Sequence, residues 1–312
     1  MPNDLLSDPV RLRALHHSNL LKAHSQAQFG RIADLVRDML DVPVAIVSIV
    51  SDTRQVFAGH RGLPAEWAAL GGTPLSHSFC QHVVDHDTPL MVTDARLEPL
   101  LAQNLAIRDL DVIAYLGIPL HLPSGEVIGA VAAINPTPRA WSSSDLERLG
   151  RVAALADMEI AVRISELKWR SLFEDMQEGF FIGEAIRDAS GRMTDWRYHD
   201  INPAFETLTG LLRHGSQGRT YRELVPNGEE SIIDTFAAVL ETGQPARFEL
   251  QIADAEQHRW FDVRVDVDRD DTGAVIGLVG TSLEITEQKR REDTLKTLLR
   301  ELSHRSKKIG RA

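Results

Sequence analysis

The 312-residue sequence has little of what several functional classes require. Its only cysteine, Cys80, cannot form a disulfide within the chain, which indicates a reducing compartment. Basic residues number 34 against 45 acidic ones, and the net charge is −11. Proteins that bind duplex nucleic acid usually carry an excess of positive charge, so we expect no nucleic-acid partner.

Long apolar runs are also missing. The longest, residues 42–50, is far too short to span a bilayer, and the N-terminal residues lack the apolar centre of a secretion signal. We therefore expect a cytoplasmic protein without membrane contact. No glycine-rich phosphate loop with its lysine is visible, and no spacing of histidines indicates a metal site.

The hydrophobic pattern predicts two α+β halves. In the first half, helical periodicity covers residues 9–40, a short helix is expected at 78–84, and strands are expected at 42–50, 55–59, 89–93, 115–122 and 127–134. In the second half, helices are expected at 203–208 and 231–240, and strands at 179–186, 193–202, 246–253, 259–268 and 275–283. This pattern predicts that each half forms an antiparallel sheet flanked by helices, an α+β fold.

A long helix is expected to join the halves. It opens with a capping-box pattern at Ser142 and shows no clear stop until about residue 177. Its apolar stripe consists of Leu149, Ala153, Ala156, Ile160, Ile164 and Leu167. We expect the first half of the stripe to pack on its own sheet, and the stripe over 149–167 to provide the stronger contact of a parallel homodimer.

The first half resembles a GAF domain over residues 20–165. The resemblance rests on FCQH at 79–82, PLMVTDA at 89–95, GIPL at 117–120, GEVIG at 125–129 and WS at 141–142. It implies a ligand cavity, with Cys80, His82 and Tyr115 as candidate lining residues. Bilin-binding relatives carry Cys followed directly by His, whereas Gln81 intervenes here, and redox relatives need a second cysteine. We therefore favour a buried, unreactive Cys80.

The second half resembles a PAS domain over about residues 170–288. NPAFETLTG at 202–210 and GTSLEITEQK at 280–289 carry the resemblance. It implies Asn202 and Trp260 as candidate cavity residues. It also implies signal transmission through Glu284, Ile285 and Thr286, with Glu284 in place of the usual Asp.

Cofactors of the PAS type are not expected. Residues 203–225 lack the cysteine of photoactive flavin domains, and residues 231–240 lack the proximal histidine of haem domains. Together with the missing Cys-His pair for bilin, this predicts a protein without bilin, flavin or haem. The small-molecule ligand stays unidentified.

The tail LLRELSHRSK, residues 298–307, resembles the phosphoacceptor box of HWE-type and related sensor histidine kinases. The resemblance implies His304 as the phosphoacceptor and a response regulator as partner of the full-length kinase. Lys308 stands where those kinases carry Asn, and the sequence ends at Ala312. We therefore expect only the start of a kinase core, without an ATP-binding domain and without kinase activity of its own. Near-heptad leucines at 295, 298 and 302 predict a coiled coil.

The expected order is an N-terminal helical segment (1–19), a GAF domain (20–165), a connector helix (166–175), a PAS domain (176–284) and an exit helix with the phosphoacceptor box (285–312). This order predicts a signal-sensing module of a two-component sensor histidine kinase. Three alternatives stay open: a free-standing GAF–PAS adaptor, a chromophore-binding photoreceptor, and an enzyme completed by a separate kinase core.

Overall fold

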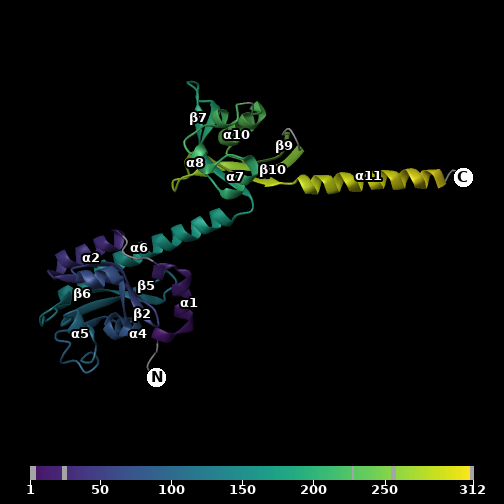
Figure 1. Cartoon of the computed structure of the whole chain (residues 1–312). Helices are drawn as coiled ribbons and strands as arrows, with labels where there is room; N and C mark the ends of the chain where they lie inside the picture. The colour runs from purple at the N-terminus through teal and green to yellow at the C-terminus, as the bar shows by residue number, and fades with distance from the viewer. Residues whose placement is uncertain (1–4, 23–26, 227, 254–257, 310–312) are drawn as a thin grey trace. The chain divides into compact units, whose positions relative to one another are not determined.

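The structure, a computed structural model, describes residues 5–22, 27–226, 228–253 and 258–309, and only the backbone of residues 22, 252, 253 and 301–309. The chain divides into two compact units, Met1–Leu167 and Lys168–Ala312. Each contains one antiparallel sheet flanked by helices (Figure 1), which confirms the expected fold class. Among the helices within the described ranges, none combines the length and the apolar character needed to cross a bilayer.

The sheet of the first unit has the strand order β3-β2-β1-β6-β5-β4. Its strands are β1 (Val44–Val50), β2 (Arg54–Arg61), β3 (Gly72–Pro74), β4 (Leu90–Val92), β5 (Ala114–His121) and β6 (Val127–Asn135). The central strands β1 and β6 are buried along almost their whole length. A strand covered on both faces needs apolar residues on both, which explains their continuous apolar sequence.

Helices cover both faces of this sheet. One face packs against α1 (Pro9–His17), α2 (Ala27–Leu40) and the first part of α6 (Ser143–Asp175). The other packs against α4 (Cys80–His86) and α5 (Ala106–Asp109). Shorter elements complete the unit: η1 (Leu5–Ser7), η2 (Leu20–Lys22), α3 (Ala65–Leu70) and η3 (Leu75–His77).

The single helix expected over residues 9–40 is wrong. α1 ends at His17, Asn19 adopts a left-handed conformation with φ 56°, and the chain re-enters helical structure at η2 and then α2. A left-handed residue cannot continue a right-handed helix. The break allows Leu15 of α1 and Phe29 of α2 to enter the same core, where both are fully buried.

The apolar stripe of α6 belongs to this core. Leu149, Ala156 and Ile160 are fully buried, and Ile164 packs against the same cluster. The expectation that the first half of this stripe packs on its own sheet is confirmed. Leu149, Ala153, Ala156 and Ile160 are therefore not available for the dimer contact expected of the stripe, and association of two chains stays a prediction.

The sheet of the second unit has the strand order β8-β7-β11-β10-β9. Its strands are β7 (Gly179–Arg187), β8 (Met193–Ile201), β9 (Ala246–Ala253), β10 (His258–Arg269) and β11 (Val275–Glu284). Its helices are α7 (Pro203–Thr209), α8 (Arg213–Ser216), α9 (Tyr221–Leu224) and α10 (Glu230–Thr242), and α11 (Thr286–Ile309) follows β11 directly.

One face of the second sheet carries an aromatic core. Its rings belong to Phe181, Trp196, Tyr198, Phe205, Tyr221 and Phe236. Trp196 stacks on Tyr221 with the ring centroids 4.2 Å apart and lies 4.5 Å from Phe236. Because side chains alternate along a strand, Phe261, Val263 and Val265 of β10 face inward, and the residues between them face the opposite side.

Candidate functional site

Two of the three cavity candidates of the first unit meet between β5 and α4. The Sγ atom of Cys80 lies 3.2 Å from the Oη atom of Tyr115, and both residues are 1% exposed. Burial raises the pKa of the Cys80 thiol and that of the Tyr115 hydroxyl. The thiolate is the nucleophilic form of cysteine, so burial and the raised pKa both disfavour reaction of this thiol. The interpretation of Cys80 as a buried core residue is confirmed.

A cavity of about 20 Å³ adjoins this pair, which is room for about one water molecule. Its walls include Phe57, Phe79 and two polar residues, Gln55 and His77. The third candidate, His82, is not among the lining residues. It is half-buried on α4, where burial lowers the pKa of its imidazole.

Sequence reasoning missed Gln55 and His77. Gln55 is 3% exposed and its carboxamide is held within the wall: it accepts from Ser78 Oγ at 2.7 Å and donates to Thr73 Oγ1 at 2.7 Å. The sequence offered one indication of Gln55. Side chains two residues apart in a strand lie on the same face, so Gln55 had to lie on the same face as the apolar Phe57.

A hydrogen bond between side chains lies beside this cavity. His77 Nε2 lies 3.1 Å from Asp109 Oδ2, which joins η3 to α5. The hydrogen bonds from Arg108 and His77 hold the pKa of Asp109 at about 2. The ring of Trp67 lies 5.2 Å from that of His77. The contact between His77 and Asp109 joins η3, which contributes His77 to the cavity wall, to α5.

A second polar cluster ties α6 to the sheet. The backbone N–H of His121, at the end of β5, donates to Asp157 Oδ1 of α6 at 2.9 Å, and His121 Nε2 lies 2.8 Å from Asp87 Oδ1. Burial raises the pKa of Asp157. Within the described part of the chain, no group of His, Cys, Asp and Glu side chains is arranged to hold a metal ion.

In the second unit, the candidate Asn202 serves the backbone and not a cavity. It is fully buried, and its Oδ1 accepts from the N–H of Phe180 at 2.7 Å and of Phe205 at 2.9 Å. Its Nδ2 donates to the carbonyl of Glu178 at 2.9 Å. Asn202 is therefore the N-cap of α7 and a tie to β7.

The candidate Trp260 lies on the opposite side of the sheet from the aromatic core, at the start of α11. Its backbone N–H donates to Thr286 Oγ1 at 2.9 Å, and its carbonyl accepts from the N–H of Ile285 at 2.7 Å. Thr286 Oγ1 in turn donates to Glu284 Oε1 at 2.7 Å. Glu284, Ile285 and Thr286 thus meet at one junction, and Trp260 belongs to it instead of to a cavity.

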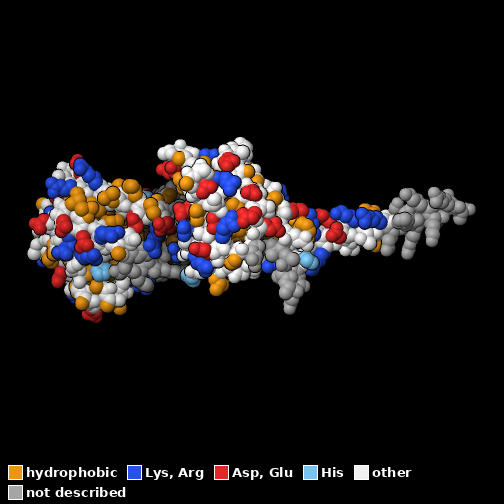
Figure 2. All heavy atoms as spheres, turned by 90° about the horizontal axis from the view of Figure 1, so that it is seen from above, with side chains coloured by type: hydrophobic (Ala, Val, Ile, Leu, Met, Phe, Trp, Pro, Cys, Tyr) orange, Lys and Arg blue, Asp and Glu red, His pale blue; other side chains and the backbone are white. Residues whose placement is uncertain are grey.

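A lysine one turn into α11 strengthens this junction. Lys289 Nζ lies 2.7 Å from Glu249 Oε2 of β9 and 5.4 Å from the ring centroid of Trp260. The first turn of α11 is therefore tied to β9 and β10 as well as to β11. Beyond this turn, the described side chains of α11 include acidic and basic groups (Figure 2), and Leu295 and Leu298 are exposed among them.

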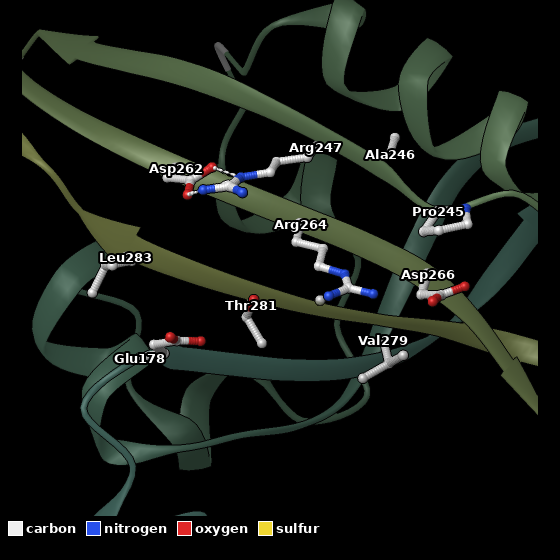
Figure 3. Close-up of a pocket in the computed structure, with 11 residues that line it drawn as sticks. Glu178, Pro245, Ala246, Arg247, Asp262, Arg264, Asp266, Val279, Thr281 and Leu283 are labelled. Carbon is white, nitrogen blue, oxygen red and sulfur yellow. Dashed lines mark hydrogen bonds and ion pairs between the residues drawn. The ribbon is translucent and has the colours of Figure 1, made fainter.

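An open groove of about 620 Å³ runs over the outer face of the same sheet (Figure 3). Its wall includes Arg247, which forms a two-pronged ion pair with Asp262 at 2.6–3.1 Å. Val279, Thr281 and Leu283 of β11 also line the groove. Mixed charges over a partly apolar floor are typical of a contact surface and contain no catalytic arrangement.

His304 lies within the helical backbone of α11. Its side chain, like that of Leu302, is outside the described residues, so its role as phosphoacceptor stays a prediction.

Comparison with known families identifies both units. The GAF domain family matches residues 25–160, and the PAS fold family matches residues 194–290. The chain therefore contains a GAF domain followed by a PAS domain. No curated protein matches the chain.

Solved structures resemble single units at low identity. The GAF domain of an Acinetobacter phosphoenolpyruvate-protein phosphotransferase is 15% identical, with a TM-score of 0.38, over 53% of this chain and 98% of that one. The PAS domain of a Colwellia psychrerythraea protein is 21% identical, with a TM-score of 0.29, over 39% and 98%. A domain of a sensory box sensor histidine kinase/response regulator from Geobacter sulfurreducens is 19% identical, with a TM-score of 0.29, over 39% and 95%.

Proposed function

We propose that this chain, with its GAF and PAS domains, is the cytoplasmic signal-sensing module of an HWE-type two-component sensor histidine kinase. A ligand or partner protein binds one domain with unequal affinity for two packing states, and the shift in population changes how α11 presents His304. The phosphate then passes from His304 to a response regulator of the full-length kinase.

The observation that carries the proposal is the path from the PAS sheet to residue 304. β11 ends at Glu284, α11 begins at Thr286, and the helix runs without a break to Ile309. Because Thr286 and Lys289 tie its first turn to β9 and β10, a displacement of these strands is transmitted to the helix. The resemblance of residues 298–307 to a phosphoacceptor box then supplies the output.

The GAF domain supplies a candidate input of the same kind. Its cavity has room for about one water in the closed state, and the His77–Asp109 pair joins the two segments that would have to part. A ligand that enters must open this pair, and two alternative packings are what a switch needs.

The test is phosphorylation of the chain by a separately purified ATP-binding domain of an HWE-type kinase, with Mg²⁺ and ATP. We expect acid-labile phosphate on His304, no label when the added domain is omitted, and no label on His304→Ala. Absence of label on His304 in the complete mixture, or unchanged labelling of His304→Ala, would contradict the kinase role.

Transmission through the junction is tested by Thr286→Val, which removes the hydroxyl between Trp260 and Glu284. Thr297→Val is the matched control, because the Thr297 hydroxyl only donates to Asp293 within α11. We expect the labelling rate to change in Thr286→Val and to stay at the wild-type value in Thr297→Val. Equal rates in all three proteins would exclude the junction as the path.

A further inference from the structure

An arginine is buried at the end of the sheet in the GAF domain. Arg11 of α1 is 1% exposed. Its Nε donates to the carbonyl of Leu5 and its Nη2 to that of Leu6, each at 2.7 Å. Its Nη1 donates to the carbonyls of Val50 and Val127, at 2.9 and 3.4 Å. Val50 ends β1 and Val127 begins β6, so Arg11 joins η1 to one end of the two central strands.

The N-terminal segment packs on both faces of this sheet. Leu5 and Leu6 pack against the apolar cluster on the cavity side. Leu15 and Leu20 are fully buried in the cluster on the other face, the one that α6 completes. The segment therefore passes around the end of the sheet, and we call its residues 5–21 the strap.

The strap is also attached to a helix that contributes to the wall of the GAF cavity. The backbone N–H of Leu6 donates to Asp85 Oδ1 of α4 at 3.4 Å. α4 begins with Cys80, which lines the cavity. The match to the GAF family starts at residue 25, so the strap lies before the part of the chain that the family describes.

The hydrogen bonds of Arg11 make the strap hold or release as a unit. If η1 left its place, Nε and Nη2 of a buried, charged side chain would lose their acceptors. A buried charged donor without a partner is costly, so Arg11 would move into water together with η1. α4 would then lose its contact at Asp85. Two alternative arrangements of this kind are what a conformational switch requires.

We propose that the strap controls access to the GAF cavity. With Arg11 in place, η1 holds α4 against the sheet and the cavity stays closed. Release of the strap frees α4 and opens the cavity. The strap acts within the GAF domain and does not depend on the kinase role, so a failure of the phosphorylation test leaves this proposal standing.

The single cysteine of the sequence provides the test, because Cys80 lines the cavity. The reaction of the full chain with dithionitrobenzoate, which releases a coloured thiolate for each thiol modified, measures how often Cys80 is reached. Arg11→Met removes the hydrogen bonds to the four carbonyls and keeps an apolar stem. We expect Cys80 to react about tenfold faster or more. Arg13→Met, exposed on the same helix, is the matched control and should react at the wild-type rate.

A second pair of variants decides the case in which Arg11→Met does not fold. Leu5→Gln with Leu6→Gln weakens the packing of η1 and leaves Arg11 intact. Its control is Val10→Gln, because Val10 is 54% exposed on α1. We expect faster reaction of Cys80 in the double variant and the wild-type rate in the control.

Ile160→Ala separates release of the strap from unfolding of the whole domain, because it weakens the GAF core and leaves Arg11 and η1 unchanged. The proteins are compared at temperatures equally far below their melting temperatures. A strap variant that reacts faster than Ile160→Ala supports the proposal. Equal rates in the two, or the wild-type rate in a folded strap variant, would overturn it.

Discussion

At the scale of single residues, polar side chains that resemble site residues are here bonded to the backbone. The carboxamide of Asn202 satisfies three backbone groups, which belong to Glu178 just before β7, Phe180 in β7 and Phe205 in the first turn of α7. A buried donor or acceptor that loses its partner costs about 1–3 kcal/mol, so such residues are required by folding alone. Chemical type therefore does not distinguish a ligand contact from a structural one.

Asn202→Ala tests this assignment. The variant loses an N-cap and leaves buried backbone groups unpaired, so we expect the free energy of unfolding of the PAS domain to fall by about 2–4 kcal/mol. Thr207→Ala, exposed on the same helix, should stay within about 0.5 kcal/mol. Urea titration followed by circular dichroism measures both. A small effect of Asn202→Ala would return the residue to the cavity candidates.

The partly buried carboxyl of Asp157 predicts that the stability of the GAF domain depends on pH. Because burial raises its pKa in the folded state, the protonated carboxyl is favoured by folding. The stability linked to it is fully present below about pH 4, the unfolded pKa, and is lost as the pH rises through the raised folded value. Asp157→Asn cannot ionise and keeps an acceptor for the N–H of His121.

The urea midpoint of Asp157→Asn relative to wild type should therefore increase between pH 3 and pH 7. Parallel titrations of the two proteins across this range measure it. A difference that stays constant with pH would show that the carboxyl does not titrate abnormally in the fold.

At the scale of elements, α6 shows how one helix serves two surfaces. Its buried side completes the GAF core, and its exposed side carries Leu155, Met158 and Val162. Sequence periodicity identified the first because the stripe is long and regular. It did not show which surface covers the stripe, since an amphipathic pattern is the same for a core contact and for a partner contact.

Ile160→Ala separates these two uses. Ile160 is fully buried, so we expect the GAF domain to lose about 2–5 kcal/mol of stability through the cavity that remains. Arg151→Ala, exposed on the same helix, should change it by less than about 0.5 kcal/mol. Chemical denaturation of the full chain, followed by circular dichroism, measures both. A tolerated Ile160→Ala would mean that this side of α6 is not a core contact.

At the scale of the whole molecule, the chain contains two domains with separate cores. The sequence lacks the Cys-His pair of bilin-binding GAF domains and the cysteine and proximal histidine of flavin- and haem-binding PAS domains. We expect the protein to purify without absorption bands in the visible range when it is produced in cells that supply haem, flavin and bilin. An absorption spectrum of the purified chain decides this. A stoichiometric visible band would instead favour the photoreceptor alternative.

The sequence by itself determined the two α+β halves, most strands to within a few residues, and both families. Long apolar strands such as β1 and a buried helix stripe leave patterns that depend only on local periodicity. The short elements α3, β3, α8 and α9 escaped, because three to six residues show no reliable period and are stabilised by what packs around them. Only the tertiary structure placed Gln55 and His77 at the GAF cavity and moved Trp260 to the α11 junction. It alone also separated the buried side of α6 from the exposed one. Each of these depends on which surfaces meet, and that is set by contacts between residues far apart in the chain.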